Sequence, residues 1–279
     1  NIINRNNRSL LLPVLVLLVG LSLLLYPVVS NAWNARHQSK SIAVYTKQVE
    51  EMSPSARQQL LDAAQSHNRA LYLSGQPFTQ TPAQAASYAG LLNPSGLGIM
   101  GYVDIPSLAV RLPIYHGTDD AVLQIGVGHV PWSSLPVGGE TTHCVLLGHR
   151  GLPSAKLFSD LDRLSLGDTF RLCVLNEMYT YQVDQILTVL PSDTAALSIE
   201  PGKEYCTLVT CTPYGINTHR LLVRGHRIQP PEDASVAAAQ SAAFEPLLFL
   251  PLIALPPLVV CLVVLLLKRR NKTLGGNRQ

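Results

Sequence analysis

Charged and aromatic residues are both scarce in this chain of 279 residues: charged side chains make up 14% of the sequence and aromatic side chains 6%. The formal net charge is only +3, which is too small to indicate a nucleic-acid partner. No pair of cysteines has CxxC spacing, so the sequence does not predict a zinc site of the usual kind. The odd number of cysteines hints at a free thiol. These cysteines are Cys144, Cys173, Cys206, Cys211 and Cys261.

Charge is missing altogether from two apolar runs near the ends of the chain, residues 10–29 and 246–267. Each run is long enough to cross the ~30 Å core of a bilayer as a helix. Arg5 and Arg8 lie in the tail 1–9 before the first run, and a basic tail, 268–279, follows the second. The positive-inside rule then places both tails in the cytoplasm and the segment between the runs outside.

Each apolar run has an alternative interpretation. Ser30-Asn31-Ala32 is a passable cleavage site, so the first run can also be a signal peptide. We favour an uncleaved anchor, because the run is long for the apolar part of a signal peptide. The second run can also be a buried core helix, which fits poorly with the basic tail after it. Residues 230–245 have the composition of a linker.

Between the runs, the sequence divides into a helical part and a strand-rich part. Residues 30–95 contain a helical pattern from Ser41 to Leu73, in which Ser53 precedes Pro54 and can cap a second helix. Residues 96–229 contain short apolar or alternating runs, which predict a mainly β domain, a barrel or a sandwich. The expected strands are 99–105, 109–115, 144–147, 169–175, 179–190, 205–210 and 220–228.

The stretch from Thr207 to Arg224 has the features of a reactive site at the end of a strand. Cys211 stands where a β-branched, apolar run stops, a loop containing Pro and Gly follows, and Arg220 opens the next apolar run. A nearby cation favours the thiolate, which is the nucleophilic form of cysteine. A buried, inert Cys211 is the alternative, and this stretch alone does not decide between the two.

Among the eight histidines, His149 is the best placed to act with Cys211. It follows the apolar strand Cys144–Leu147 just as Cys211 follows its own strand. If the two strands are adjacent and parallel, both residues emerge at the same rim of the sheet. His219 is the alternative, because it adjoins Arg220.

The same spacing makes a prediction about two other cysteines. Cys144 lies five residues before His149 (149 − 144), and Cys206 lies five residues before Cys211 (211 − 206). Adjacent parallel strands would therefore place Cys144 beside Cys206. Two reduced core cysteines are the favoured state; a disulfide is the alternative, which the geometry of neighbouring strands makes demanding.

Arg220 is a candidate for binding the substrate backbone or a developing oxyanion, because its guanidinium is planar and permanently charged. A surface salt bridge is the alternative for this residue. Arg224 lies four residues deeper on the same face of the strand and is the weaker candidate.

Several motifs of the chain resemble those of the sortases, and in particular of class C, the pilus-building branch. The residues TLVTC from Thr207, followed by Arg220, resemble the active-site segment of that family. The resemblance extends over residues 88–228 and includes MGYVDIP from Met100, LPIYHGT from Leu112, LPVGGE from Leu135 and GHRGLPSAKLFSDL from Gly148. It implies an eight-stranded β-barrel with short helices over residues 96–229, on an N-terminal helical arm and between two transmembrane helices.

The resemblance also implies a chemistry. Cys211 would attack the Thr–Gly carbonyl of an LPXTG-like sorting signal of a pilin, His149 would act as acid and base, and Arg220 would steady the oxyanion. The resulting thioacyl enzyme would pass the pilin to a lysine amine of an acceptor pilin, and neither a metal nor an organic cofactor is implied. The enzyme would lie in the plasma membrane of a Gram-positive bacterium as a two-pass protein with its catalytic domain outside. The alternatives are a cell-wall-anchoring or mainly hydrolytic sortase, or a membrane-tethered binding module with an inert Cys211.

Class C sortases usually carry a lid with an Asp-Pro-aromatic motif, and Gln76-Pro77-Phe78 stands at the corresponding place here. Phe78 would cover the thiol of Cys211. Gln76 replaces the usual aspartate and cannot form an ion pair with Arg220, so we expect a lid that is held more weakly. An ordinary linker containing proline is the alternative.

Overall fold

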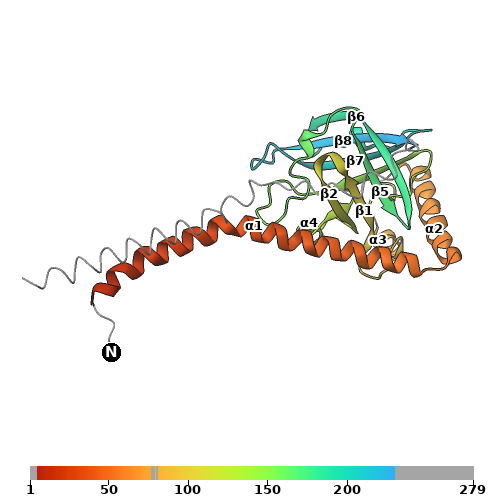
Figure 1. Ribbon diagram of the computed structural model, residues 1–279. Helices are drawn as coiled ribbons and strands as arrows, with labels where there is room; N and C mark the ends of the chain where they lie inside the picture. Colours follow the sequence, from red (N-terminus) through yellow and green to blue (C-terminus); the bar gives the residue numbers. More distant parts are fainter. Residues whose placement is uncertain (1–4, 77–78, 80, 230–279) are drawn as a thin grey trace, which may run out of the picture. The chain divides into compact units, whose positions relative to one another are not determined.

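The computed structural model describes residues 5–76, 79 and 81–229, and it describes side chains from residue 15 onward. Pro77, Phe78, the predicted linker 230–245, the predicted second span 246–267 and the tail 268–279 lie outside the described residues. The chain divides into two units, Asn1–Ser30 with Ala243–Gln279, and Asn31–Ala242. The second unit contains the barrel, whose strands are labelled in Figure 1.

Among the residues that the structure describes, three helices precede the barrel: α1 (Arg5–Glu51), α2 (Pro54–Leu73) and α3 (Pro82–Gly90). The hydroxyl of Ser53 accepts a hydrogen bond from the N–H of Ala56, which confirms the predicted cap of α2. Thr81 and Gln84 form a reciprocal capping box at the start of α3. The breaks between these helices therefore follow from local capping chemistry.

The N-terminal part of α1 is the one helix of the described residues that is long and apolar enough to cross a membrane. The segment Leu15–Glu51 has a mean hydropathy of 2.0 in its most apolar window, and no part of that window is buried inside the protein. Leu23 and Leu24 are 70% and 67% exposed. Large apolar side chains with this exposure are typical of a surface that meets lipid or another apolar partner.

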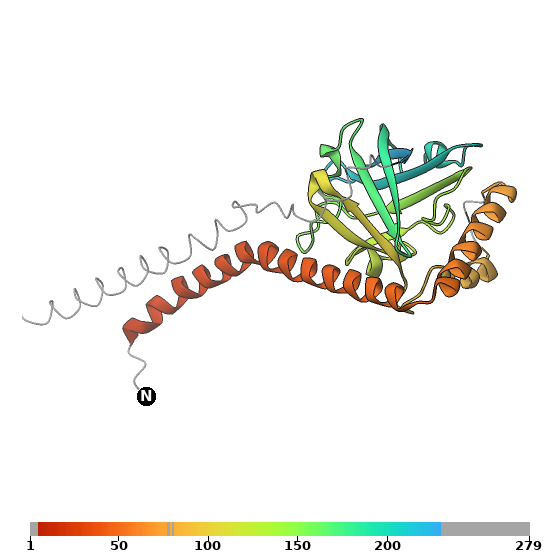
Figure 2. The ribbon, with the colours of Figure 1, turned by 45° about the vertical axis from the view of Figure 1, so that its right-hand side comes forward.

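Eight strands of the described residues close into a barrel in the order β1-β2-β3-β4-β7-β8-β6-β5. Figure 2 shows the barrel from a second side. Two strand pairs, β2 with β3 and β4 with β7, are parallel, and the other pairs are antiparallel. The predicted eight-stranded barrel with short helices is thus confirmed. The strands are β1 (Ile99–Ile105), β2 (Val110–His116), β3 (Val127–His129), β4 (Thr142–Leu147), β5 (Thr169–Val174), β6 (Glu177–Val189), β7 (Glu204–Thr212) and β8 (His219–Ile228).

Short helical turns fill the connections between the strands. The helix α4 (Asp120–Leu123) lies before β3, and three 3-10 turns lie in other loops. These turns are η1 (Pro106–Leu108), η2 (Leu161–Arg163) and η3 (Ala195–Leu197). The turn η3 belongs to the connection between β6 and β7, residues 190–203.

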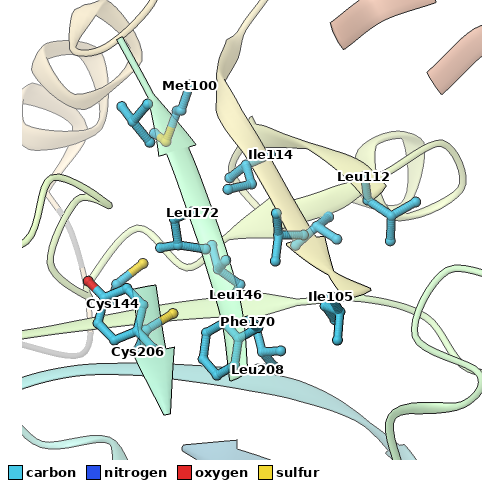
Figure 3. Packing of buried hydrophobic residues seen from close by; sticks show 14 of the residues in the cluster. Met100, Ile105, Leu112, Ile114, Cys144, Leu146, Phe170, Leu172, Cys206 and Leu208 are labelled. Carbon is cyan, nitrogen blue, oxygen red and sulfur yellow. The ribbon is translucent and has the colours of Figure 1, made fainter. Parts of the chain in front are cut away.

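The interior of the barrel holds the main hydrophobic core. Figure 3 shows Leu146, Leu208 and Phe170 packed there with the sulfur atoms of Cys144 and Cys206 close by. A second, smaller apolar cluster lies on the other face of the same strands, where Leu197 of η3 packs with Val145, Val209 and Leu222. The strands β4, β7 and β8 are therefore apolar on both faces, as expected where a loop covers a sheet.

Tyr45 fastens the C-terminal half of α1 to the barrel. Its side chain is 2% exposed, and its hydroxyl donates to the carbonyl oxygen of Met100 at 2.8 Å. The same hydroxyl accepts a hydrogen bond from the N–H of Leu175 at 2.8 Å. The helical arm is thereby bonded to β1 and to the turn after β5.

Candidate active site

Cys211 lies at the end of β7 and faces out of the barrel. Side chains alternate between the two faces of a strand. Leu208 packs in the barrel core and Val209 in the outer cluster, while Thr210 is fully buried. Cys211 therefore shares the outer face with Val209, and it is the partly exposed cysteine among those that the structure describes.

His149 emerges beside this strand end. The strands β4 and β7 are parallel neighbours, with Leu147 opposite Val209. One step further, the N–H of Gly148 donates to the carbonyl oxygen of Val209 at 3.0 Å, and the hydroxyl of Thr210 donates to the carbonyl oxygen of Gly148 at 2.8 Å. The pairing thus continues up to the residue before His149, and the structure brings His149 and Cys211 to one rim.

A glycine is required just before His149. A Cβ at Gly148 would lie 2.5 Å from the ring of Phe158, which is buried in the core. The carbonyl oxygen of His149 accepts a hydrogen bond from the N–H of Phe158 at 3.1 Å. The backbone of the histidine is therefore fixed against a core residue on one side and against β7 on the other.

Arg220 is the register partner of Cys211 across the antiparallel pair of β7 and β8. Residues that stand opposite each other in such a pair project from the same face. Its Nη1 donates to the carbonyl oxygens of Asn217 and His219, at 3.2 and 3.1 Å. The guanidinium is thus folded back over the β7–β8 loop, on the same rim as the thiol.

The other described cysteines are buried in or near the barrel core. Cys144 and Cys206 are register partners on β4 and β7, as the equal spacing predicted, and both are free thiols. Burial raises the pKa of Cys206 well above its ordinary value, and burial also raises the pKa of Cys173 on β5. Burial opposes the thiolate of Cys144 as well, but hydrogen bonds with Cys206 and His129 outweigh it and lower the pKa of that thiol. The three thiols are each at most 8% exposed, so a substrate does not reach them, and Cys211 is the accessible candidate among the described cysteines. Cys261 lies outside the described residues.

Other histidines are engaged elsewhere. His143 lies within β4, where its Nδ1 is 2.9 Å from the carbonyl oxygen of Ser198 and its Nε2 is 2.7 Å from the hydroxyl of Thr207. Burial lowers the pKa of His143 to about 4, so it is neutral at physiological pH. His219 stands at the start of β8 with its Nδ1 2.9 Å from the hydroxyl of Thr218.

Arg224 takes part in an ion-pair network deeper on the outer face. Its Nε and Nη2 contact the two carboxylate oxygens of Asp184 at 3.0 and 3.1 Å, and its guanidinium stacks 4.1 Å from the centre of the Tyr205 ring. A further ion pair joins its Nη1 to Glu200 at 3.7 Å. The guanidinium of Arg224 is thus engaged by Asp184, Glu200 and Tyr205, in agreement with its ranking as the weaker candidate.

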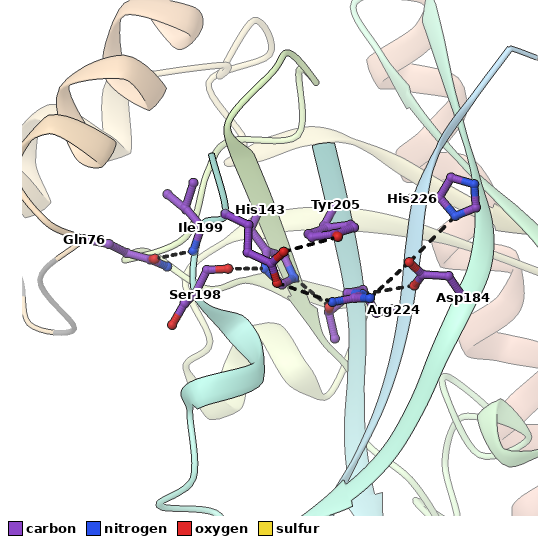
Figure 4. Close-up of polar contacts among 10 residues, drawn as sticks. Gln76, His143, Asp184, Ser198, Ile199, Tyr205, Arg224 and His226 are labelled. Carbon is purple, nitrogen blue, oxygen red and sulfur yellow. Dashed lines mark hydrogen bonds and ion pairs between the residues drawn. The ribbon is translucent and has the colours of Figure 1, made fainter. Parts of the chain in front are cut away.

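Gln76 docks on the β6–β7 connection. Its side chain is 7% exposed; its Nε2 donates to the carbonyl oxygen of Leu197 at 3.2 Å, and its Oε1 accepts from the N–H of Ile199 at 2.8 Å. Figure 4 shows this contact beside the pair of Ser198 and His143. The partners of Gln76 are therefore backbone groups of that connection, while the predicted lid residues Pro77 and Phe78 lie outside the described residues.

The sequence interpretation missed one residue of this rim, Arg150. Its Nη1 donates to the hydroxyl of Thr212 at 3.2 Å, and its Nη2 forms an ion pair with Asp162. Only its position directly after His149 signalled it in the sequence. No group of three or more potential metal ligands occurs among the residues that the structure describes.

A partly exposed thiol at the rim of a closed barrel, with a histidine just after the neighbouring parallel strand and a guanidinium across the antiparallel pair, is typical of a cysteine acyl-transfer enzyme. Comparison with known proteins narrows this class. Residues 103–228 match the sortase domain family. A sortase A of Streptococcus agalactiae is 30% identical over 208 residues, which cover 72% of this chain and 77% of that protein. The chain therefore belongs to the sortase family and is a cysteine transpeptidase.

Solved structures agree with this assignment. The crystal structure of sortase C1 from Streptococcus agalactiae is 48% identical and has a TM-score of 0.67, over 69% of this chain and all (100%) of that chain. Sortase C of Streptococcus pneumoniae, whose crystal structure gives insight into pilin substrate specificity, is 40% identical with a TM-score of 0.60, over 68% of this chain and 97% of that chain. The resemblance to class C sortases is thereby confirmed.

Proposed function

We propose that this sortase cleaves LPXTG-like sorting signals of pilins and joins the pilins to one another. The observation that carries the proposal is the common rim of Cys211, His149 and Arg220, on a barrel that is similar to sortase C structures. Sortases of this class act on pilins, and the similar Streptococcus pneumoniae enzyme has a pilin substrate specificity of its own.

The proposed acyl transfer has two steps. In the first, the Sγ of Cys211 bonds to the Thr carbonyl carbon of the signal, the Thr–Gly C–N bond breaks, and His149 gives its proton to the leaving amine. In the second, His149 takes a proton from the incoming lysine amine, whose nitrogen displaces the thiolate. Arg220 donates hydrogen bonds to the oxyanion of each tetrahedral intermediate. The net change exchanges one amide for another, with no oxidant or reductant.

The outer face next to Cys211 suits the apolar start of the sorting signal. Partly exposed apolar side chains lie there on two strands: Leu147 on β4, and Leu187 and Val189 on β6. Val189 stands opposite Arg220 in the register, one row from Val209 and Leu222. A peptide that extends from the thiol over this face would bury its leucine and proline against an apolar floor.

We further propose that α1 anchors the enzyme in the plasma membrane of a Gram-positive bacterium, with the barrel outside. The apolar, exposed segment that begins at Leu15 supports this, together with the cell-surface association of the family. The two-pass topology is part of the proposal, because the run 246–267 lies outside the described residues. A lid formed by Gln76-Pro77-Phe78 stays a prediction, and of these only Gln76 has described contacts.

The test is intact-mass analysis of the detergent-solubilised full chain after incubation with an LPXTG peptide. We expect a thioacyl adduct on the parent and on the control Cys173→Ala, and none on Cys211→Ala. An adduct that persists in Cys211→Ala would refute the assigned nucleophile. No adduct on any variant, together with slow alkylation of Cys211, would favour the membrane-tethered binding module.

A second experiment addresses the acceptor. Incubation with a whole pilin that carries its own sorting signal should yield isopeptide-linked multimers, and replacement of the acceptor lysine by arginine should abolish them. Release of a free carboxylate without multimers would instead show a mainly hydrolytic sortase. Transfer to a short cell-wall peptide amine, but not to pilin, would show the anchoring alternative.

A further inference from the structure

Arg150 links the two chain segments that carry the residues that we propose to react. It directly follows His149, and Thr212, which accepts its hydrogen bond, directly follows Cys211. The bond from Nη1 of Arg150 to Oγ1 of Thr212 is 3.2 Å long. One side chain thus joins the chain just beyond the histidine to the chain just beyond the cysteine.

The other end of the guanidinium is anchored on a rigid turn. Its Nη2 contacts Oδ2 of Asp162 in η2, where the neighbouring Leu161 is fully buried in the core. The N–H of Gly151 also donates to the hydroxyl of Ser159 at 3.1 Å. The loop that carries His149 is therefore bonded to residues 158–162 as well as to β7.

The β7–β8 loop covers the same guanidinium. The ring of Tyr214 has its centre 5.9 Å from Cζ of Arg150. A Cβ at Gly151, whose φ is +77°, would lie 3.0 Å from that ring. The close approach of the two loops thus depends on a glycine, and it leaves only 9% of the Arg150 side chain exposed.

The burial of Arg150 is unfavourable for the stability of the fold, so stability by itself does not explain the residue. Its Nε has no hydrogen-bond partner within the described part of the chain. Burying a charge with an unsatisfied donor is unfavourable, and a neutral side chain would fill the same space at lower cost. The planar guanidinium reaches two separate acceptors at once, which explains why an arginine stands here, because the three donors of a lysine ammonium all lie on one nitrogen.

We propose that Arg150 is a positioning residue of the transpeptidase: it ties the end of β7 to the loop after β4 and so sets the separation of Cys211 and His149. The inference rests on the proposed roles of those two residues. A displacement of about 1 Å between reacting groups can lower a rate about 100-fold. Arg150 touches neither the substrate nor the reacting atoms in this scheme.

Two variants separate geometry from charge. Arg150→Lys keeps the positive charge but cannot hold Thr212 and Asp162 together, and Thr212→Val removes only the acceptor. We expect each variant to lower the kcat of transpeptidation about 10- to 100-fold, with KM changed less than about twofold. The double variant should be no worse than Arg150→Lys, because both changes break one link. Arg163→Gln is the matched control, since Arg163 is exposed on the same turn and pairs with Asp160.

A substrate-free measurement keeps this inference distinct from the proposed function. The rate of iodoacetamide alkylation of Cys211 at pH 7 should fall about three- to tenfold in both single variants, towards the rate in His149→Ala, and should not change in Arg163→Gln. If the parent forms no acyl adduct, the proposed function fails, while these rates still test the link. Wild-type kcat and wild-type alkylation rates in folded Arg150→Lys and Thr212→Val would overturn the inference. Thermal unfolding identifies folded variants, and Thr212→Val alone decides if Arg150→Lys does not fold.

Discussion

The Gln76→Glu substitution exchanges one atom in a buried contact and tests how the segment after α2 is held. In the parent, the amide of Gln76 donates to the carbonyl oxygen of Leu197 and accepts from the N–H of Ile199. In the variant, one carboxylate oxygen still accepts the hydrogen bond from the N–H of Ile199. The other oxygen faces a carbonyl oxygen, across a distance that is 3.2 Å in the parent.

The size of the effect follows from these two contacts. An unsatisfied buried group costs about 1–3 kcal/mol, and burial of an ionised carboxylate adds to that cost. We therefore expect Gln76→Glu to lower the free energy of unfolding by about 3 kcal/mol at pH 7. Burial should raise the pKa of the new carboxyl group above its unfolded value of about 4.3. The deficit should then be small below about pH 4.3 and should grow as the pH rises through the folded pKa.

Denaturant unfolding of the full chain at several pH values measures this deficit. Hydrogen–deuterium exchange of the Ile199 amide gives a local measure, since that amide keeps its acceptor in Gln76→Glu and loses it in Gln76→Ala. Gln65→Glu is the matched control, because Gln65 is exposed on α2. A parent-like unfolding free energy at pH 7 with no dependence on pH would refute the assigned docking.

Two further predictions concern buried polar groups. Tyr45→Phe deletes the hydroxyl bonded to Met100 and Leu175, and it should cost about 2–4 kcal/mol in denaturant unfolding; a loss below about 0.5 kcal/mol would contradict this. Burial lowers the pKa of His143 to about 4, below its unfolded value of about 6.5, so its contribution to stability falls as the pH drops from 6.5 towards 4. Between pH 7 and pH 5, the parent should lose about 2 kcal/mol more than His143→Gln, and equal losses would disprove the assignment.

The sequence interpretation took the parallel pairing of β4 and β7 as its condition, because two apolar runs of similar length end at residues with matching chemistry, and the structure has this pairing. Cys144 and Cys206 stand at equal distances from His149 and Cys211, and the register places them opposite each other. The predicted common rim depends only on that register. The family resemblance supplied the closure of the barrel, which strand patterns alone left open between barrel and sandwich.

The strand β3 was not predicted. It consists of Val127, Gly128 and His129, too few residues to show an alternating pattern, and a central glycine weakens the strand signal. The glycine is required by packing, since a Cβ there would lie 2.3 Å from the carbonyl oxygen of Gly117. Pairing with β2 and β4 on either side makes this segment a strand, and such tertiary pairing leaves no local trace.

Contacts with the long β6–β7 connection were not predicted from the sequence. His143 lies near the start of β4, where the β6–β7 connection covers it and supplies Ser198 as a partner. Gln76 was considered only as a substitute for an ion-pair partner of Arg220, and its contacts lie on the same connection. Sequence gives no measure of how a loop of this length folds over a sheet, so neither contact had a local signal.

Cys206 and Cys211 differ in exposure because side chains alternate between the two faces of β7. The two thiols are five residues apart on β7, an odd separation, so the strand places them on opposite faces. Cys206 is fully buried beside Cys144 in the core, while Cys211 lies partly exposed beside Arg220 on the outer face. A register slip of one residue would bury Cys211 and expose its neighbour. The hydrogen bond from Thr210 to Gly148 opposes such a slip at the end where the chemistry is proposed, so the same contact that fixes the fold also keeps the nucleophile accessible.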